Sequence, residues 1–369
     1  MSDKKLPSLD ELRVDIDSLD CEIHSLLNKR AKVAQLVAEV KLHDIPVEQH
    51  DEVKFYRPER EAQVLRAVKV RNEGPLPDNT VAHIFREIMS ACLALEQPMT
   101  IAFLGPEGTF THAAAQKHFG AAAIAKPVSA IDQVFSQVES GEATYGVVPV
   151  ENSTEGMVNH TLDNFMQSSL KICGEVELPI NLHLLVNPSA TKDSVKRICA
   201  HQQALAQSRS WLDQHWPDVP REAVGSNALA AQMAERDPSV AAIAGSMAVD
   251  LYGLVTLSEN IQDLSNNTTR FLIVGREGVG PSGEDKTSVI VSTHNKPGAL
   301  YQLLGSFQRE DIMLTRIDTR PSRTENWAYV FFMEFEGHIE EPAVQKVLNE
   351  LKEQSIVLKA LGSYPKAAL

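Results

Sequence analysis

Apolar residues recur every three or four positions along the first forty residues, which is the spacing of one face of an α-helix. This stripe comprises Leu9, Leu12, Ile16, Leu19, Ile23, Leu26, Val33, Val37 and Val40. Arg30 occupies a position of the stripe where a leucine is expected. Ser8 and Glu11 have the spacing of a capping box, and no stop signal precedes His43. The pattern predicts a helix on the order of 50 Å long, whose apolar face needs an antiparallel or intertwined dimer to cover it.

Two further helices are predicted before residue 100. The second begins near Arg57, with Pro58 at a favourable first position. The third follows the segment LPDNT, with Asp78 or Asn79 as its N-cap, and runs to about Gln97.

Charged residues lie on the apolar sides of all three helices. Lys41 returns to the side of Arg30, because the intervening residues make almost three turns at about 3.6 residues each. Glu61 lies on the apolar side of the second helix, and Glu96 ends the apolar stripe of the third. Each charge alone is explained by ion pairing or snorkelling at a helical seam. Together they favour a pocket for an anion, since several buried cations are costly unless they are compensated.

From Met99 onward, short apolar runs alternate with helical patterns, which indicates an α/β region. The predicted strands are TIAFLG, YGVVPV, LHLLV, VKRICA, REAVGS, SVAAIAG and TTRFLIVG. Several of them lead into Gly, Ser, Thr or Asn at the start of a helix, where unpaired backbone N–H groups can bind anions.

The Gly-rich segment 275–286 reads as a linker to a third region. The pattern after it predicts the order βαββαβ over about 80 residues, which is typical of a ferredoxin-like module.

Composition limits the classes of function. With 369 residues, two or three domains are expected. A formal net charge of −14 argues against nucleic-acid binding, and no apolar run suggests a membrane span or a signal peptide. The four cysteines are far apart, so neither a metal site nor a disulfide framework is indicated. We expect a cytoplasmic protein.

The helical segment 8–97 resembles the all-helical chorismate mutase domain, through LRVDIDSLDCEIHSLLNKRAKVAQLVAEVK, YRPEREAQVL and FREIMSACLALEQ. The resemblance implies an intertwined homodimer, or a higher homo-oligomer, that converts chorismate to prephenate without a cofactor. It implies carboxylate-binding roles for Arg30 and for Arg13 of a second copy, and an ether-oxygen role for Lys41. Arg60 and Glu61 match an Arg–Glu pair whose carboxylate holds the ring hydroxyl.

Two positions depart from that pattern. Arg57 replaces a common acidic residue, and Glu96 stands where some members have glutamine. Glu96 can donate a hydrogen bond only when it is protonated. We therefore expect mutase activity to fall as the pH rises through the pKa of Glu96, and Glu96→Gln to flatten that profile.

Residues 100–276 resemble prephenate dehydratase, through IAFLGPEGTFTHAAA, GVVPVENSTEGMVNHTLD and NNTTRFLIVG. The resemblance implies two α/β lobes like those of periplasmic binding proteins, the second over about 180–257, with the active site between them. It implies that prephenate loses CO2 and hydroxide, and that Thr269 donates a hydrogen bond to the departing hydroxyl. Thr268 should face the other way. The candidate substrate-binding residues are Thr109, Thr111, Asn152, Ser153, Gln207 and Arg270. Ala200 replaces a usual serine, which removes one expected hydroxyl.

Residues 286–366 resemble an ACT domain, through NKPGALYQLL and TRIDTRPSR, with Asp-Thr where Glu-Ser is usual. The resemblance implies that phenylalanine binds between two such modules and inhibits the dehydratase. The implied phenylalanine-binding residues are Asn295, Gly298, Ala299, Leu300, Arg320 and Pro321.

The sequence thus predicts a multidomain bifunctional enzyme of phenylalanine biosynthesis. Two alternatives stay open at this stage. The chain could be a non-catalytic amino-acid-binding regulator, or a dehydratase whose mutase is impaired by Arg57 and by the long loop HDIPVEQHDEVKF.

Overall fold

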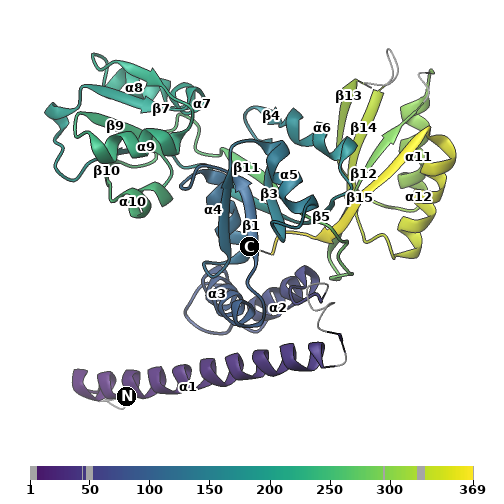
Figure 1. Cartoon of the computed structure of the whole chain (residues 1–369), viewed down its shortest axis with the longest axis horizontal. Helices are drawn as coiled ribbons and strands as arrows, with labels where there is room; N and C mark the ends of the chain where they lie inside the picture. Colours follow the sequence, from purple (N-terminus) through teal and green to yellow (C-terminus); the bar gives the residue numbers. More distant parts are fainter. Residues whose placement is uncertain (1–5, 44, 47–52, 294–295, 322–328, 369) are drawn as a thin grey trace, which may run out of the picture.

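A computed structural model of the chain describes residues 6–43, 45–46, 53–293, 296–321 and 329–368. Within this part, a helical N-terminal domain lies beside the first of two α/β lobes, and that lobe lies between the second lobe and a C-terminal α+β domain (Figure 1). None of the described helices is long and apolar enough to cross a membrane.

Three helices form the N-terminal domain: α1 (Leu9–Leu42), α2 (Pro58–Val70) and α3 (Asp78–Glu96). The predicted capping box of α1 is confirmed, since the Ser8 side chain accepts from the Glu11 N–H and the Glu11 carboxylate accepts from the Ser8 N–H. The predicted start of α2 at Pro58 is also confirmed. The predicted cap of α3 is wrong by one residue, because Pro77 takes that position and Asp78 Oδ1 instead accepts from Asn72 Nδ2 at 2.7 Å.

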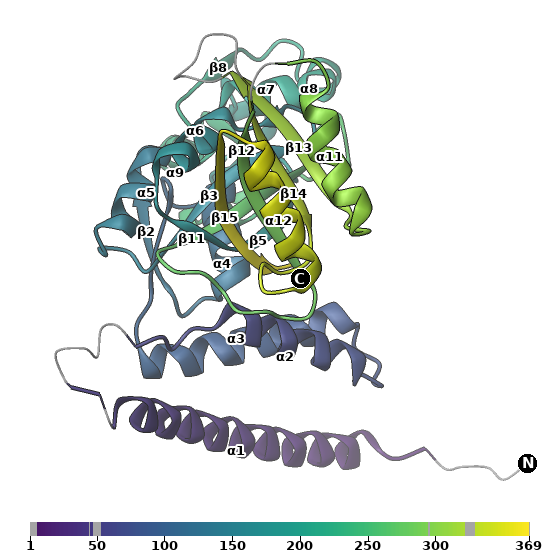
Figure 2. The ribbon, with the colours of Figure 1, turned by 90° about the vertical axis from the view of Figure 1, so that its right-hand side faces the viewer.

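Helix α1 presents its apolar face to solvent. It runs alongside α2 and α3 on the outer side of the domain (Figure 2). Of its residues only Ala38 is buried, and its large apolar side chains from Leu9 to Val40 are between 37% and 75% exposed. An exposed apolar surface of this length is unusual for a monomeric soluble protein.

The first lobe carries a sheet of order β2-β1-β3-β11-β5, with the short β4 beside β3. Its strands are β1 (Thr100–Leu104), β2 (Ile124–Val128), β3 (Tyr145–Asn152), β4 (Gly156–Met157), β5 (Lys171–Pro179) and β11 (Thr268–Gly275). Its helices are α4 (Phe110–Phe119), α5 (Ile131–Glu139) and α6 (Asn159–Gln167). Strand β4 and, in the second lobe, β10 (Val255–Ser258) are missing from the set predicted from the sequence, and so are β2 and β5. Pro127 and Gly174 with the charged Glu175 and Glu177 hid their strand character.

The second lobe carries a separate sheet of order β10-β6-β9-β7-β8. Its strands are β6 (His183–Val186), β7 (Arg197–Ala200), β8 (Arg221–Ala223), β9 (Val240–Ala244) and β10 (Val255–Ser258). Its helices are η2 (Lys192–Ser194), α7 (Gln202–Gln207), α8 (Arg209–His215), α9 (Asn227–Arg236) and α10 (Met247–Tyr252). The chain enters this lobe after β5 and returns through β11, so the lobes are joined by two crossings. Thr269 is the second residue of β11.

The C-terminal domain has an antiparallel sheet of order β13-β14-β12-β15 with two helices on one face. Its elements are β12 (Asp285–Ser292), α11 (Ala299–Arg309), β13 (Leu314–Pro321), β14 (Tyr329–Glu336), α12 (Pro342–Gln354) and β15 (Val357–Pro365). This βαββαβ order is the one expected from the sequence. The other face of the sheet contributes Ile290, Phe332 and Tyr364 to the core of the first lobe.

Close backbone approach ties the domains together. A Cβ at Gly362 of β15 would lie 2.5 Å from the Ile172 carbonyl oxygen of β5, so only glycine permits this contact. On the opposite side, Tyr56 from the helical domain shares a core with Phe103 and Phe119 of the first lobe. The first lobe is therefore packed against both neighbouring domains.

Candidate functional site

The first candidate site is an open cavity of about 880 Å³ within the helical domain. All three helices line it: α1 contributes Arg30 and Lys41, α2 contributes Arg60 and Glu61, and α3 contributes Glu96. The structure thus brings together five of the predicted mutase residues. Arg13 does not line this cavity. It lies near the other end of α1, exposed and paired with Asp10 at 3.4 Å.

Positive charge is in excess around this cavity. Arg30, Lys41, Arg57 and Arg60 line it, against the carboxyl groups of Glu59, Glu61 and Glu96. Two of those three acids have a raised pKa, so each holds a proton more readily than an ordinary carboxyl group does. Burial raises the pKa of Glu96 against the opposing effect of Lys41 and Arg30. Burial likewise raises the pKa of Glu61 to about 7, although Arg86 lies against it. A negatively charged ligand would balance the remaining cations.

Lys41 is held in place by its surroundings. Its Nζ donates to the carbonyl oxygens of Lys54 at 3.2 Å and Phe55 at 3.4 Å, and lies 5.0 Å from the centre of the Phe55 ring. Burial lowers its pKa, and the nearby Glu96 partly offsets this effect. Arg30 is exposed and donates from Nη1 to the Ile88 carbonyl at 3.5 Å. Both cations therefore face the cavity from α1, which is its exposed wall.

The second candidate site is the cleft between the two α/β lobes, with a volume of about 530 Å³. The predicted residues Thr109, Thr111, Asn152, Gln207 and Thr269 all line it. Of the lining residues that the structure describes, Glu155 and His201 are the ones with readily ionisable side chains, and no lysine or arginine is among them. An anion in this cleft must therefore be held by neutral donors.

Hydrogen bonds across the lobes orient the cleft residues. Asn152 Nδ2 donates to Thr269 Oγ1 at 2.8 Å and to Asn267 Oδ1 at 2.9 Å. Asn267 Nδ2 donates in turn to Gln207 Oε1 of the second lobe at 3.2 Å. The buried Gln207 Nε2 has no hydrogen-bond partner among the described residues. A donor buried without a partner at a cleft wall is a position where a ligand acceptor would be stabilised.

The turn before α4 also bridges the lobes. The Thr109 side chain caps α4 by accepting from the His112 N–H, and its hydroxyl donates to the Leu104 carbonyl at 3.1 Å. Gly108 has φ +81°, and a Cβ there would lie 3.1 Å from the Tyr252 ring of α10. The Tyr252 hydroxyl donates to the Glu107 carbonyl at 2.7 Å. The first turn of α4 thus meets the second lobe at the cleft.

Two predicted cleft residues lie elsewhere. Ser153 Oγ accepts from the Thr268 N–H at 2.9 Å and does not line the cleft. The prediction that Arg270 binds substrate carboxylates is not supported. Its side chain is buried on the other face of β11, where Nη1 lies 2.7 Å from Glu334 and 3.2 Å from Glu175. Strand alternation explains this placement, since Thr269 faces the cleft and its neighbour must face away.

A third, smaller cavity of about 210 Å³ lies at the start of α11. Gly298, Ala299 and Leu300 line it, and Gly298 is the N-cap of α11 with φ +80°. Arg320 does not line this cavity, because its Nη2 lies 2.8 Å from Asp163 of α6. Asn295 and the side chain of Pro321 lie outside the described residues.

Two residues that contact the predicted site residues were not predicted from the sequence. Asn267 stands in the segment NNTTRF, and its adjacency to Thr269 was the available signal. Arg86 lies in FREIMSACLALEQ, but its partners come from α4 and α2, so no local pattern could reveal its role.

The family model "Prephenate dehydratase" matches residues 101–279, and "Chorismate mutase type II" matches residues 12–97. A bifunctional chorismate mutase/prephenate dehydratase of Pseudomonas aeruginosa is 55% identical and covers 98% of both chains. The protein of the same name from Aquifex aeolicus is 45% identical over 99% of both.

Among solved structures, a prephenate dehydratase from Arthrobacter aurescens in complex with L-Phe is similar. It is 35% identical, has a TM-score of 0.66, and the match covers 72% of this chain and 89% of that one.

Proposed function

The chain belongs to the bifunctional chorismate mutase/prephenate dehydratase family, and on that premise we propose which residues carry each of its two reactions and how phenylalanine regulates them. The alternative of a non-catalytic regulator is set aside, because the relatives over the full length are bifunctional enzymes. The assignment of one reaction to each site rests on the separation of two chemically different cavities. A cation-rich cavity lies within the helices, and a cation-free cleft lies between the lobes.

In the mutase cavity, Arg30 binds a carboxylate of chorismate and Lys41 donates to the ether oxygen. The rearrangement is pericyclic, so it needs no protein nucleophile. Binding of the compact conformer supplies proximity, and fixed positive charge stabilises the oxygen of the breaking bond as it becomes negative. Glu96 in its protonated form donates to that same oxygen, and Glu61 accepts from the ring hydroxyl. Arg60 adds to the positive potential of the wall.

A second copy of the chain completes this cavity. The exposed stripe of α1 extends over its whole length, and burying each Leu, Ile or Val of such a stripe is worth about 1.5–3 kcal/mol. Arg13 lies near the far end of α1, so it reaches a mutase cavity only in the partner of a homodimer. Sedimentation at micromolar concentration that gave a stable monomer would contradict this assembly.

Mutase activity is expected to decrease on the alkaline side as the pH rises through the pKa of Glu96. Burial raises that pKa, so the protonated donor persists above the usual carboxyl range and is lost at higher pH. Glu96→Gln supplies an amide donor at every pH, so the alkaline decrease should disappear from the pH profile of mutase kcat/KM. The matched control, Glu73→Gln on an exposed loop, should keep the decrease. A decrease unchanged in Glu96→Gln would reject this role.

In the dehydratase cleft, Thr269 donates a hydrogen bond to the departing hydroxyl of prephenate. Asn152 Nδ2 already donates to Thr269 Oγ1, so the oxygen is occupied as an acceptor and its O–H is free to donate to substrate. Loss of CO2 and hydroxide makes the ring aromatic, which supplies the driving force. Stabilising the hydroxyl as it leaves is therefore the main task of the site.

Neutral donors retain the two carboxylates of prephenate in the cleft. The N-terminus of α4 at Thr109 and that of α9 after Ser226 both line it, and their first-turn N–H groups favour anions. Gln207 Nε2 is a further donor without a protein partner. Cationic side chains would bind the carboxylates of both the substrate and the product strongly, and would therefore slow release of the product. A cleft without lysine or arginine avoids this and suits turnover.

Phenylalanine binds the ACT domain at the start of α11 and inhibits the dehydratase. In support, the positive φ of Gly298 brings backbone close to the small cavity there, and a similar dehydratase was solved with L-Phe. Strand β13 also contacts the first lobe through the ion pairs Arg316–Glu151 and Arg320–Asp163. A change at the sheet could reach Glu151, the neighbour of Asn152, through this contact. Linkage requires phenylalanine to bind the inhibited form about 1–3 kcal/mol more tightly.

Gly298→Val should weaken phenylalanine inhibition by about tenfold or more, because a β-branched residue is strained at φ +80° and shifts the backbone that lines the cavity. Basal dehydratase activity should stay unchanged. Titration of dehydratase activity with phenylalanine measures the effect, with Gly278→Ala in the linker as control, since a Cβ there meets nothing within 4 Å. Wild-type dehydratase activity that did not change with added phenylalanine would contradict the proposal.

The two half-reactions must be assayed separately, from chorismate to prephenate and from prephenate to phenylpyruvate. Full dehydratase activity together with weak mutase activity would favour the alternative in which Arg57 and the loop before it impair the helical site. Comparable rates for both would reject that alternative.

A further inference from the structure

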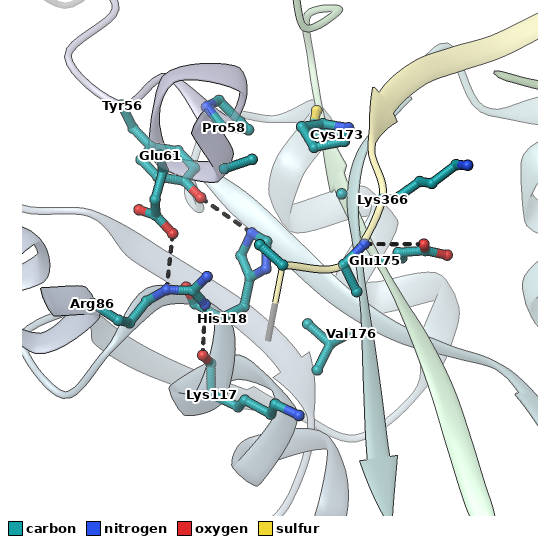
Figure 3. Close-up of a pocket in the computed structure, with 15 residues that line it drawn as sticks. Tyr56, Pro58, Glu61, Arg86, Lys117, His118, Cys173, Glu175, Val176 and Lys366 are labelled. Carbon is teal, nitrogen blue, oxygen red and sulfur yellow. Dashed lines mark hydrogen bonds and ion pairs between the residues drawn. The ribbon is translucent and has the colours of Figure 1, made fainter. Parts of the chain in front are cut away.

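Arg86 of α3 is a buried cation that reaches from the helical domain into the first lobe. Its side chain is 7% exposed. Nη1 donates to the carbonyl oxygens of Lys117 and His118 at the end of α4, each at 2.7 Å, and Nε lies 3.0 Å from Glu61 Oε1 on α2. Figure 3 shows this guanidinium between the Glu61 carboxylate and the end of α4. Arg86 therefore joins a mutase carboxylate to the dehydratase domain.

The contact around Arg86 is tightly packed. A Cβ at Gly120, just after α4, would lie 2.5 Å from the Ser90 Cβ of α3. The Ala121 N–H donates to Glu87 Oε2 at 3.0 Å. The hydroxyl of Tyr56 lies 3.1 Å from His118 Nε2, as Figure 3 also shows. Such close packing fixes the end of α4 relative to α3, so the two carbonyl oxygens give Arg86 a rigid anchor.

Glu61 keeps its hydrogen-bonding capacity despite this pairing. Its side chain is 13% exposed, and the contact of its carboxylate with Arg86 is an ion pair. The Nε–H of Arg86 is not directed at the carboxylate in hydrogen-bond geometry, so the contact is an ion pair only. A buried carboxylate whose charge is compensated by an ion pair is suited to accept from a ligand hydroxyl.

We propose that Arg86 is a positioning residue of the mutase reaction, which keeps Glu61 ionised and aimed at the substrate hydroxyl, and that the dehydratase domain thereby completes the mutase site. The inference rests on the proposed role of Glu61. It explains why the end of α4 is packed so closely on α3. It also implies that the helical domain carries out its reaction fully only within the whole chain.

The charges near Glu61 support this role for Arg86. The titratable and charged groups that line the surrounding cavities with Glu61 are Arg30, Lys41, Tyr56, Arg57, Glu59, Arg60, Arg86, Cys92, Glu96, Lys117, His118, Cys173, Glu175 and Lys366. Among them Arg86 is the cation in ion-pair contact with Glu61. Burial keeps the pKa of His118 well below its usual value, so that ring is neutral and supplies no compensating charge. Loss of Arg86 would leave Glu61 buried without its partner, and Glu61 would take up a proton.

The test uses the full chain in the Glu96→Gln background, which removes the ionisation of Glu96. Mutase kcat/KM should then rise with pH through one midpoint near the pKa of Glu61, about 7. Adding Arg86→Gln should move that midpoint up by about one unit or more, which lowers kcat/KM at neutral pH about fivefold. Arg86→Lys should give an intermediate midpoint, because an amine keeps the charge but cannot donate in the same fork.

Dehydratase activity on prephenate should be unchanged in these variants, which reports that the chain is folded. The matched control is Arg66→Gln, which removes another partly buried arginine that contacts the linker and the C-terminal segment instead of Glu61. Its midpoint should stay at the starting value. If Arg86→Gln fails to fold, the Arg86→Lys midpoint decides alone.

Glu61→Gln separates the inference from its premise. In the Glu96→Gln background it should abolish the rising limb and most of the mutase activity. A limb that persists in Glu61→Gln would overturn the proposed role of Glu61 itself. The role of Arg86 alone would be overturned by two results together. The rise of kcat/KM with pH would disappear in Glu61→Gln, and Arg86→Lys and Arg86→Gln would leave the midpoint unmoved.

Discussion

Thr269→Val is expected to lower dehydratase kcat/KM by about 10²–10³, the loss typical of removing one donor to a developing negative charge. Valine has nearly the shape of threonine, and it keeps the strand but cannot donate to the departing hydroxyl. Mutase activity should be unchanged, so the variant should accumulate prephenate when it is given chorismate. Thr269→Ser should recover much of the lost activity, since it retains the hydroxyl next to Asn152.

The adjacent Thr268 provides the control, because it does not line the cleft. Thr268→Val changes the same chemistry on the same strand, and it should leave both activities within about twofold, as surface substitutions usually do. Equal losses in the two valine variants would show that the effect comes from strand β11 and not from a hydroxyl in the cleft. Near-normal dehydratase activity in Thr269→Val would remove Thr269 from the mechanism.

Arg30→Ala should lower mutase kcat/KM by about 10³ or more, with dehydratase activity unchanged. Arg30 lines the helical cavity together with Glu61 and Glu96, so alanine removes a cation that binds a substrate carboxylate. Arg30→Lys should recover only part of the loss, because an amine cannot form the paired hydrogen bonds of a guanidinium to a carboxylate. Separate assays of chorismate and prephenate consumption measure the effect.

Lys32→Ala is the control for Arg30. Lys32 is an exposed cation on the same helix, and it does not line the cavity. Its loss changes the net charge by the same amount, so a similar loss of mutase activity in both variants would show a general electrostatic effect. Normal activity in Lys32→Ala with a large loss in Arg30→Ala would place the effect at the cavity.

The helical site could be predicted largely from the sequence. Helical periodicity places Arg30 and Lys41 on one side of α1, because their separation is close to a whole number of turns. The same argument puts Glu61 and Glu96 on inward faces of α2 and α3. These residues do line one cavity in the structure. Which of them bind which substrate atoms stays a prediction.

Tertiary partners could not be predicted from the sequence. The resemblance of NNTTRFLIVG to prephenate dehydratase predicts that Arg270 binds substrate, but its partners Glu175, Glu334 and Glu151 come from three separate strands. Only the packing of the C-terminal sheet against β5 and β11 reveals this ionic network. Arg86 was missed for the same reason, since the docking of α4 on α3 leaves no trace in either segment.

The most direct test of two separate sites in one chain is a complementation assay with the Arg30→Ala and Thr269→Val variants. Chorismate is supplied without added cofactor, and phenylpyruvate is measured. Each variant alone should form little phenylpyruvate, and an equimolar mixture should form it readily, because prephenate made by Thr269→Val is consumed by Arg30→Ala. A mixture no more active than either variant alone would contradict the account.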